Sequence, residues 1–550
     1  MLRFIANTIG CKVNQYETRA AAGLLSGLGA VEVGSTGRSG GDGAVDLVLV
    51  NTCCVTAAAA AKSRRAVRRS VRRHPRADVV IFGCYATRQA QLLRQLARRA
   101  GSSGNVHLAG HCDDVAECLL RAAASLRQRK ASGDSPSSCA RAPTTPGTNQ
   151  SSKDFRRPSL SGHGQNANLT SLTGGPVRYD ESMKAGPHQH PASPTHISAS
   201  RSDSIKPPQG CNVKNNIGTA LLPPIANFAG RQRAFVKVQD GCDAACSYCL
   251  IPRLRRRVWS RPMEQILTEV RALAANGHRE VVLCGVFLGA YGRATAVRRK
   301  WPGPSALPEL LARVAGVEGL WRVRLSSLEP GDVSDELLEV MADRRNVAPH
   351  LHLSLQSGSG PVLRRMNRQY GPEEFLAAVG RARRRLDRPA VTTDVIVGFP
   401  GEGEADFAAT LAVARRAGFA KIHIFGFSAR PDTAAWKWRC EAPPAAVVKA
   451  RCKQLAELER QSARAFRRQF VGRTVEVLLE QPNSKTPPGH ARGLTDRYVE
   501  VTFPLAESAL PAEQAGEVVP VRIAGLGEHG LVGSRVESEG VLRAAEGSGI

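Results

Sequence analysis

Six short apolar runs with strand character recur between residues 234 and 427, and helical segments lie between them. The runs are Ala234–Val238, Glu280–Cys284, Trp321–Leu325, His350–Leu355, Val391–Val397 and Lys421–Phe427. Met263–Asn276 and Pro372–Leu386 are two of the intervening segments with helical spacing. Strands that alternate with helices of this length pair in parallel, so the pattern predicts a (β/α) barrel, complete or partial.

A smaller alternation of the same kind lies before residue 130, and a different pattern follows residue 470. The first part alternates strand-like and helical segments: Leu2–Thr8, Asn14–Leu28, Asp46–Val50, Ala58–Arg73, Asp78–Phe82 and Gln89–Arg99. This order predicts a parallel α/β domain. After a charged helix at Ala445–Phe470, short alternating strands are separated by Gly and Pro: Thr474–Leu479, Arg497–Phe503 and Glu517–Ile523. They predict a small all-β module.

Residues 131–230 have a composition unlike the rest of the chain. They hold 12 of the 33 prolines, are rich in Ser, Gly and Asn, and show little apolar periodicity. Such a segment cannot bury enough apolar surface to offset its ordering entropy, so we interpret it as a disordered linker or insertion. We expect domains at 1–128, 231–468 and 469–540, with the linker at 129–230. The segment 131–230 carries only +4 of the formal charge of +28, so the folded domains carry the basic excess.

Composition excludes several classes of protein. No run approaches 18 apolar residues, so we expect no membrane-spanning helix. The N-terminus lacks a charged leader followed by a long apolar core, which argues against a secretory signal. Fourteen cysteines in 550 residues are too few for a disulfide scaffold. We therefore expect a cytoplasmic protein with no membrane partner, whose basic excess indicates a polyanionic partner, a solvated surface or a compositional bias.

Cys242, Cys246 and Cys249 directly follow the first strand of the predicted barrel in a C-x3-C-x2-C pattern. Three thiolates on one loop can hold three irons of a cubic iron–sulfur cluster and leave the fourth iron open for a small ligand. A zinc ribbon, the main alternative, normally needs a second cysteine pair at a similar site. The loop lies where barrel enzymes place their chemistry, which favours the cluster.

The segment Phe235–Cys249, followed by Ile251 and Pro252, resembles the radical S-adenosylmethionine enzymes, specifically the methylthiotransferases. In that family the open iron of a 4Fe-4S cluster binds S-adenosylmethionine, and reduction cleaves it to a 5′-deoxyadenosyl radical. The resemblance implies a partial (β/α)6 barrel of the radical S-adenosylmethionine type, with Tyr248 near the adenine. The chain departs from the family at 253–256, where relatives usually have Tyr-Ala-Arg-Gly.

In the N-terminal part, Cys11, Cys53 and Cys84 each follow a predicted strand. The carboxyl ends of parallel strands gather at one edge of a sheet, so a shared edge would bring the three thiols together. Taken alone, the residues favour the alternative of buried cysteines that act as small apolar side chains. The resemblance implies instead that these three cysteines hold an auxiliary 4Fe-4S cluster and take part in sulfur transfer. The family's Asn-Thr-Cys pattern selects Cys53 over its neighbour Cys54.

Polar residues and glycines follow the later strands of the predicted barrel. They include Ser326, Ser327, Glu329, Gln356–Ser359, Asp394 and Gly398–Gly401. Each is also compatible with ordinary turn chemistry, but together they occupy the active face of a barrel. The resemblance implies that Ser327 and Glu329 approach the methionine or ribose of S-adenosylmethionine. It also implies that Asp394 and Gly398 line the adenosine.

A predicted helix just after Cys53 is dense in basic residues. Its i, i+4 spacing aligns Arg64, Arg68 and Arg72 in one row. Such a row suits contacts with RNA phosphates, and a solvated arginine-rich face is the alternative.

The C-terminal module resembles the TRAM domain, a small RNA-binding β-barrel. The resemblance lies in Gly472–Glu480, Gly493–Val501 and Gly516–Ile523. Arg497 and Tyr498 are predicted to contact an RNA phosphate and a stacked base, and cross-strand packing is an alternative for Tyr498.

Three segments indicate which subgroup of the family the chain resembles: Gly10–Glu17, His350–Ser359 and Lys421–Phe425. They look like the tRNA N6-threonylcarbamoyladenosine methylthiotransferases. The implied reaction adds a methylthio group to C2 of that adenosine, next to the anticodon, with one S-adenosylmethionine as methyl donor and a second as radical source. The implied cofactors are two 4Fe-4S clusters and S-adenosylmethionine. The implied partners are the tRNA anticodon arm, an electron donor such as flavodoxin or ferredoxin, and a sulfur source.

Other functions stay open on this evidence. The nearest is methylthiolation of isopentenyl-adenosine in tRNA, and the next is methylthiolation of an aspartate on a ribosomal protein. The basic charge discriminates weakly against the second, because such an enzyme also meets ribosomes. A function of a different class is a non-catalytic RNA-binding protein that uses the β-module and the basic helix.

Overall fold

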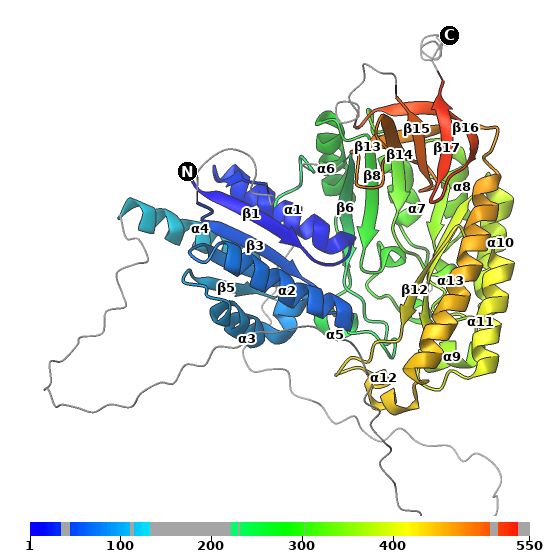
Figure 1. Cartoon of the computed structure of the whole chain (residues 1–550), viewed down its shortest axis with the longest axis horizontal. Helices are drawn as coiled ribbons and strands as arrows, with labels where there is room; N and C mark the ends of the chain where they lie inside the picture. The colour runs from blue at the N-terminus through cyan, green and yellow to red at the C-terminus, as the bar shows by residue number, and fades with distance from the viewer. Residues whose placement is uncertain are drawn as a thin grey trace, which may run out of the picture. The chain divides into compact units, whose positions relative to one another are not determined.

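The structure is a computed structural model, and it describes residues 1–34, 44–110, 115–132, 222–228, 232–301, 303–505 and 515–536. All of these belong to one compact unit. They form an N-terminal α/β part, a central α/β part and a C-terminal β-barrel, as the sequence predicts (Figure 1). Within these residues, no helix combines the length and the apolar character needed to cross a bilayer.

The N-terminal part is a parallel sheet covered on both faces by helices. Its strands are β1 (Arg3–Thr8), β2 (Val31–Glu32), β3 (Leu47–Thr52), β4 (Asp78–Gly83) and β5 (Val106–Ala109). Its helices are α1 (Lys12–Gly27), α2 (Ala57–Arg73), α3 (Cys84–Arg99) and α4 (Val115–Ala131). The strand order is β2-β1-β3-β4-β5. The helices α1 and α4 pack on one face and α2 and α3 on the other, so β3 and β4 are buried along their whole length.

The central part contains the six parallel strands that the sequence predicts, divided between two sheets. Its strands are β6 (Arg233–Asp240), β7 (Trp259–Ser260), β8 (Glu280–Gly285), β9 (Arg322–Leu325), β10 (His350–His352), β11 (Ala390–Val397) and β12 (Lys421–Gly426). Isolated bridges, such as Leu328 with Leu353, join the sheet β7-β6-β8-β9 to the sheet β10-β11-β12. The result is a partial (β/α)6 barrel with β7 and β12 at its two edges.

Helices of varied length surround this partial barrel. They are α5 (Ile251–Leu254), α6 (Met263–Ala275), α7 (Leu307–Ala315), α8 (Asp335–Asp343), α9 (Gly360–Arg365), α10 (Pro372–Arg385), α11 (Glu404–Ala417), α12 (Ala434–Lys437) and α13 (Ala445–Arg468). The long helix α13 packs against β12 and leads into the C-terminal barrel.

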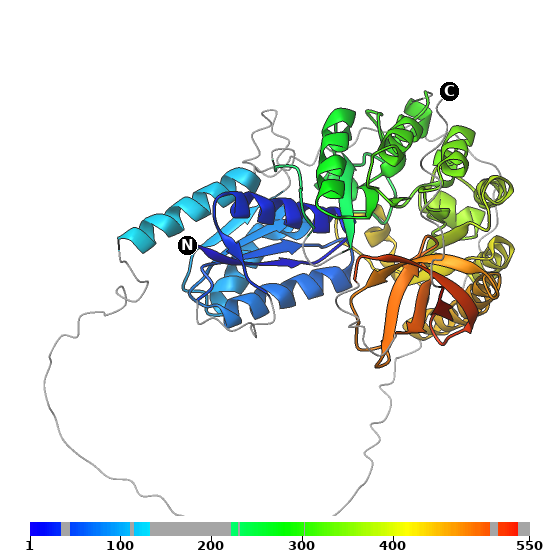
Figure 2. The same ribbon diagram turned by 90° about the horizontal axis from the view of Figure 1, so that it is seen from above.

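The C-terminal part is a small closed barrel with the strand order β13-β14-β15-β17-β16 (Figure 2). Its strands are β13 (Thr474–Glu480), β14 (His490–Thr495), β15 (Glu500–Pro504), β16 (Val518–Leu526) and β17 (Leu531–Arg535). The sequence predicted one strand over Arg497–Phe503, but β15 begins only at Glu500. The preceding residues turn instead, because the amide of Val499 bonds back to the hydroxyl of Thr495 (3.2 Å).

The predicted linker at 129–230 is shorter than expected at both ends. The helix α4 continues to Ala131, and Leu222, Ile225 and Phe228 are at most 8% exposed within the large apolar core. The amide of Phe228 donates to Nε2 of His278 (2.8 Å). These apolar side chains pack although their segment is rich in proline, and residues 133–221 lie outside the described residues.

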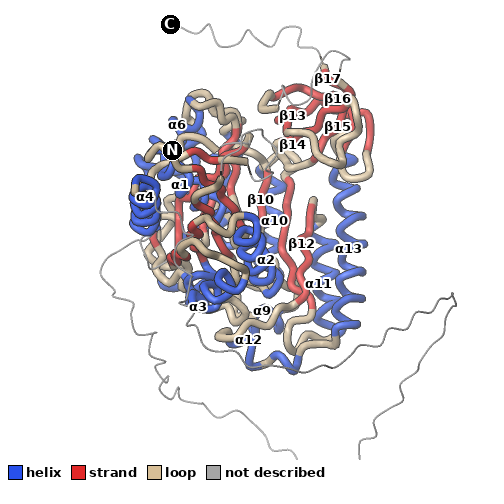
Figure 3. Tube along the Cα trace, turned by 60° about the vertical axis from the view of Figure 1, so that its left-hand side comes forward, coloured by secondary structure: helices blue, strands red, loops and turns tan. Residues whose placement is uncertain are grey.

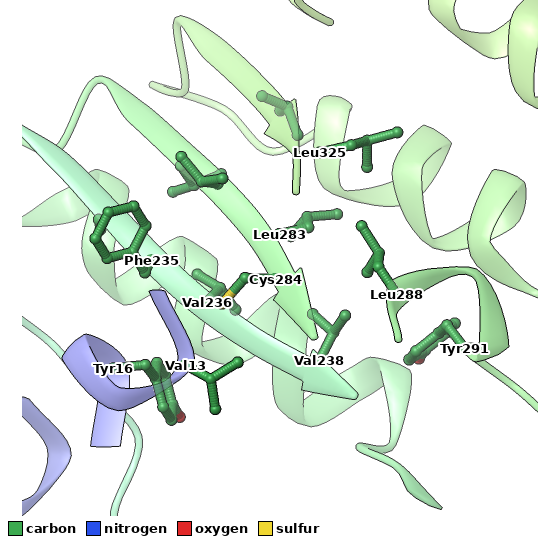
Figure 4. Close-up of a cluster of buried hydrophobic side chains, with 14 of the residues drawn as sticks. Val13, Tyr16, Phe235, Val236, Val238, Leu283, Cys284, Leu288, Tyr291 and Leu325 are labelled. Atoms are coloured by element: carbon green, nitrogen blue, oxygen red, sulfur yellow. The ribbon is translucent and has the colours of Figure 1, made fainter. Parts of the chain in front are cut away.

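Helix α1 joins the N-terminal and central parts through apolar contacts. Figure 4 shows Val13 and Tyr16 of α1 beside Val236 and Val238 of β6, within one continuous core. The hydroxyl of Tyr16 also donates to a carboxylate oxygen of Glu269 on α6 (3.1 Å). Because α1 starts directly after Cys11, this packing positions the N-terminal cysteine edge against the barrel.

Candidate active site

Three neighbouring strands of the N-terminal sheet each end at a cysteine. Cys11 follows β1, Cys53 follows β3, and Cys84 follows β4. Because β1, β3 and β4 are adjacent and parallel, the three cysteines lie at the same edge of the sheet. The strand order thus produces the shared edge that the sequence pattern suggested.

Glycine and asparagine hold the three loops close together. Gly10 has a φ of +134°, and a Cβ at this position would lie 3.1 Å from the Cβ of Cys53. Gly83 has a φ of +92°, and a Cβ there would lie 2.2 Å from Oδ1 of Asn51. Asn14 donates to that same oxygen (3.0 Å), and Asn51 donates to the carbonyl of Asn14 (2.9 Å). The loops that carry the cysteines are therefore in close contact.

The neighbours Cys53 and Cys54 have different surroundings. Cys54 is fully buried in the apolar cluster beneath α2 and α3, and its thiol donates to the carbonyl of Cys84 (3.4 Å). Burial, with a contribution from Cys11, raises the pKa of Cys53 to about 11. Burial likewise raises the pKa of Cys84 to about 12, with contributions from Cys53 and Cys11. These contributions show that the thiols of Cys11, Cys53 and Cys84 are near neighbours, and Cys54 contributes to the pKa of Cys53 in the same way.

Cys242, Cys246 and Cys249 lie on the loop that leaves β6. Burial raises the pKa of Cys242 and of Cys249 to about 12, and it raises the pKa of Cys246 as well. Buried thiols with raised pKa values stay protonated at neutral pH unless a cation compensates the thiolate charge. A bound metal supplies that compensation and deprotonates its thiol ligands. The donor set at both cysteine sites therefore fits an iron–sulfur cluster.

Arg368 links the barrel cysteine loop to the rest of the barrel through hydrogen bonds. Its guanidinium donates to Sγ of Cys246 (3.1 Å), to the hydroxyl of Tyr248 (3.3 Å) and to the carboxylate of Glu329 (2.5 Å). The side chain is only 7% exposed, so these contacts are shielded from water. A positive group at this sulfur stabilises the thiolate that a cluster requires. Sequence reasoning missed Arg368, because it stands outside every motif.

A buried ionic network connects the two cysteine sites. Both carboxylate oxygens of Glu17 on α1 accept from Arg255 (2.8 and 2.9 Å), and one of them also accepts from Lys237 on β6 (3.0 Å). Asp240 accepts from Arg255 and from Lys237 at 2.8 Å. All four side chains are at most 8% exposed. The carbonyl of Arg255 also accepts from the amide of Cys242 (2.9 Å), so the network reaches the barrel loop directly.

Sequence reasoning missed this network as well. The available signals were that Glu17 closes the segment Gly10–Glu17 and that Arg255 occupies the arginine position of the family pattern. Neither signal shows that the two residues meet, because 238 positions separate them. The pairing follows only from the packing of α1 against the barrel.

Two family models match this chain. Residues 236–414 match the radical SAM superfamily, and residues 3–101 match the uncharacterized protein family UPF0004. The chain is also 31% identical over 528 residues to the threonylcarbamoyladenosine tRNA methylthiotransferase of Chlamydia pneumoniae, a match that covers 96% of this chain and 97% of that one. The chain belongs to the radical S-adenosylmethionine methylthiotransferases. The chain is therefore an enzyme of the transferase class. Membership of this family implies S-adenosylmethionine and a 4Fe-4S cluster as cofactors.

Other relatives match a shorter part of the methylthiotransferase. The tRNA-2-methylthio-N(6)-dimethylallyladenosine synthases of Anaeromyxobacter dehalogenans and Maricaulis maris are 41% and 38% identical. Each match covers 56% of this chain, and 64% and 65% of the two relatives. Among solved structures, a radical S-adenosylmethionine methyltransferase from Kitasatospora setae matches with a TM-score of 0.45 and 14% identity, over 97% of this chain and 84% of that one.

Two predicted cofactor residues of the methylthiotransferase, Tyr248 and Gly398, lie near each other at the barrel cysteine loop. The ring of Tyr248 lies edge-on to Phe399, with 6.4 Å between centroids, and Gly398 directly follows β11. Ser327 after β9 is exposed, and its neighbour Ser326 is buried. The hydroxyl of Ser326 has no hydrogen-bond partner among the described residues. A buried hydroxyl without a protein partner fits a site that receives a polar ligand.

Glu329 and Asp394 already have protein partners. Glu329 pairs with Arg298 and Arg368, which hold its carboxylate at the end of β9. Oδ2 of Asp394 lies 3.3 Å from Nε2 of His352. The partner that the structure shows for Asp394 is thus a histidine, and contact of either carboxylate with S-adenosylmethionine stays a prediction.

A basic groove lies between α2 and α3. Its lining residues are Arg64, Arg68, Arg72, Leu92, Gln95, Leu96, Arg99 and Ala100. Arg68 and Arg72 are exposed, and Arg64 donates to the hydroxyl of Tyr85 (2.8 Å). The three predicted arginines therefore line one groove, close to the residue that follows Cys84.

Arg497 and Tyr498 pack against the central part. Arg497 donates to the carbonyls of Asp387 and Arg388 (2.7 and 3.0 Å). The ring of Tyr498 lies 3.7 Å from the guanidinium carbon of Arg324 in a cation–π contact. The structure therefore shows packing contacts for both side chains, the alternative left open for Tyr498, and their contact with RNA stays a prediction.

We expect the variant Tyr498→Leu to lower the free energy of unfolding by about 2 kcal/mol, because it loses a largely desolvated cation–π contact. The control Tyr498→Phe keeps the ring and should retain most of this stability. Urea unfolding of the two variants in parallel measures the difference. Equal losses in both would show that the ring face does not stabilise this junction.

Proposed function

We propose that this chain is a tRNA methylthiotransferase that adds a methylthio group to C2 of N6-threonylcarbamoyladenosine, next to the anticodon. The observation that carries the proposal is the match to the Chlamydia enzyme, which covers 96% of this chain and 97% of that one. The dimethylallyladenosine synthases match over only 56% of this chain.

The proposed cofactors are two 4Fe-4S clusters and S-adenosylmethionine. Cys242, Cys246 and Cys249 would hold one cluster, and the N-terminal cysteine edge would hold the other. When bound, these groups supply the methyl group, the sulfur chemistry and the radical that removes the C2 hydrogen. The residues of the chain orient the two sites: Arg368 holds Cys246, and the buried ionic network keeps the N-terminal edge against the barrel loop.

Lys12 is the proposed partner for a carboxylate on the substrate. It directly follows Cys11, and burial lowers its pKa. The thiols of Cys284 and Cys11 raise this pKa, and the guanidinium groups of Arg324 and Arg233 lower it. A bound carboxylate would offset both lowering effects. The threonylcarbamoyl group carries a carboxylate at neutral pH, whereas the dimethylallyl group is uncharged.

A second candidate substrate is dimethylallyladenosine in tRNA. It is favoured by the higher identity, 41% for the Anaeromyxobacter dehalogenans enzyme, over the shared region. The two candidates differ in the side chain on N6 of the same adenosine, so a direct comparison separates them.

The test uses the reconstituted enzyme on two anticodon stem-loops that differ only in the N6 group. We expect the threonylcarbamoyl substrate to react at least about tenfold faster, because polar recognition groups reject a substrate that cannot pair with them. The variant Lys12→Met should reduce this preference and keep S-adenosylmethionine cleavage. Faster reaction of the dimethylallyl substrate would overturn the proposal.

The basic groove is the proposed contact with the tRNA backbone. In the double variant Arg68→Ala, Arg72→Ala, the plot of log affinity against log salt should become less steep. The magnitude of its negative slope should decrease by about 1.5 to 2, because two phosphate contacts are lost. Filter binding at several salt concentrations measures this slope. The control Arg344→Ala, Arg345→Ala removes the same charge from an exposed segment after α8 and should leave the slope unchanged. An equal effect in both variants would show that only the overall charge matters.

A further inference from the structure

Two histidines and an aspartate lie together on the sheet β10-β11-β12. His352 ends β10, Asp394 lies on β11 and His423 lies on β12. The register pairs Asp394 directly with His423, and it pairs His352 with Thr392, two residues before Asp394. Residues two apart on a strand share a face, so the three side chains lie on the same face of this sheet.

The opposite face of the same strands is covered by helices. Leu351, Val391, Val395 and Ile422 are at most 3% exposed and belong to the large core. Figure 3 shows α11 and α13 along one side of β12, and α13 packs on both β11 and β12. The histidine face is therefore the inner face of the partial barrel. It is accessible, because His352 and Asp394 are half-buried and His423 is exposed.

The distances between the three side chains match a single-ion site. One ligand atom from each residue lies within 4.8 Å of the other two. Nε2 of His352 and Oδ2 of Asp394 are 3.3 Å apart. Two ligands of a tetrahedral zinc ion, each about 2.1 Å from the metal, are about 3.4 Å apart.

A further contact orients the His352 ring. Its Nδ1 lies 3.0 Å from Oγ1 of Thr392, so its Nε2 is directed toward Asp394. Metal-binding histidines nearly always hydrogen-bond through their second ring nitrogen, which fixes the ring and the tautomer. His423 is exposed, and its ring centroid lies 5.7 Å from that of His352, so the two imidazoles are neighbours.

We propose that His352, Asp394 and His423 bind one divalent transition-metal ion of the zinc class. Two imidazoles and one carboxylate are typical of zinc sites that keep an open coordination position. With only one carboxylate, the site favours such an ion over Mg²⁺ or Ca²⁺, which prefer oxygen ligands. The open position faces the inside of the barrel, where it can take a water or an oxygen of a substrate. The site uses neither cysteine set and does not depend on the proposed tRNA substrate. It gives Asp394 a metal-binding role in place of the adenosine contact that the resemblance implies.

The test measures zinc and iron in the holoenzyme after anaerobic cluster reconstitution and dialysis against low zinc. We expect about one zinc per chain in the wild type and about none in His352→Ala or His423→Ala, with iron content unchanged. The variant Thr392→Val should bind zinc about 10- to 100-fold more weakly, because it loses the contact that orients His352. His529→Ala removes an exposed histidine of the C-terminal barrel and serves as the matched control.

Two results would overturn the proposal. Equal zinc in the wild type and both histidine variants would assign the metal to another site, such as incompletely loaded cysteines. Wild-type protein without zinc would also overturn it, and a loss of methylthiolation in His423→Ala would then indicate direct contact of the imidazole with substrate. The iron content distinguishes either result from misfolding, because the clusters require the folded cysteine sites.

Discussion

Replacing Cys84 with alanine should abolish methylthio transfer and leave the cleavage of S-adenosylmethionine intact. Cys84 lies at the N-terminal sheet edge with Cys11 and Cys53, whereas the barrel loop holds its own three cysteines. The variant Cys242→Ala should have the opposite defect and stop cleavage altogether. Each variant should lose about four of about eight irons per chain, because each removes a ligand of one cubic cluster.

The measurement is anaerobic quantification of 5′-deoxyadenosine, methylthiolated nucleoside and iron in the same samples. Cys54→Ala is the matched control, since Cys54 is buried in the apolar cluster beside the proposed ligand Cys53. It should retain iron and both products. Full iron content and transfer activity in Cys84→Ala would contradict the assignment of the N-terminal edge as a cluster site.

The variant Glu17→Gln should be the most damaging single change outside the cysteines. It leaves the buried cations of Arg255 and Lys237 with Asp240 as the remaining anion of the network. Removing one partner of a buried ionic network costs about 3–5 kcal/mol of folding free energy, because the remaining charge is not compensated. We also expect methylthio transfer to fall more than cleavage of S-adenosylmethionine, because Glu17 links the N-terminal cysteine edge to the barrel.

Chemical unfolding together with the two product assays tests this prediction. Glu32→Gln is the matched control, because it removes the surface pair with Arg19, which should cost at most about 1 kcal/mol. Adding Lys237→Met to Glu17→Gln removes one of the uncompensated cations and should restore part of the stability. If Glu17→Gln costs no more than Glu32→Gln, the network does not stabilise the junction.

Local patterns in the sequence predicted the order of the folded parts and the positions of the cysteines. Parallel strands with helices between them place their carboxyl ends at one edge, so Cys11, Cys53 and Cys84 could meet there, and the family resemblance selected them as a ligand set. Element bounds were less accurate. The helix predicted at Gln89–Arg99 begins at Cys84 and bends at Gln89, where the backbone leaves the helical region.

Contacts between distant segments could not be predicted in this way. His352, Asp394 and His423 meet only through the register of three strands, and no spacing in the chain indicates it. Tyr498 shows a related limit, because an aromatic residue in a β-turn can equally stack on a base or pack on another part of the protein. Its ring packs against Arg324, and this contact depends on how the C-terminal barrel docks against the central part.

Mass analysis of tRNA nucleosides from a strain that lacks this chain is the decisive test of the proposed substrate. We expect that 2-methylthio-N6-threonylcarbamoyladenosine is lost and that threonylcarbamoyladenosine without the methylthio group accumulates. The wild-type chain should restore the nucleoside, and the Cys242→Ala variant should not. Unchanged 2-methylthio-N6-threonylcarbamoyladenosine in the deletion strain, with loss of the methylthio-dimethylallyl nucleoside instead, would show that dimethylallyladenosine is the substrate.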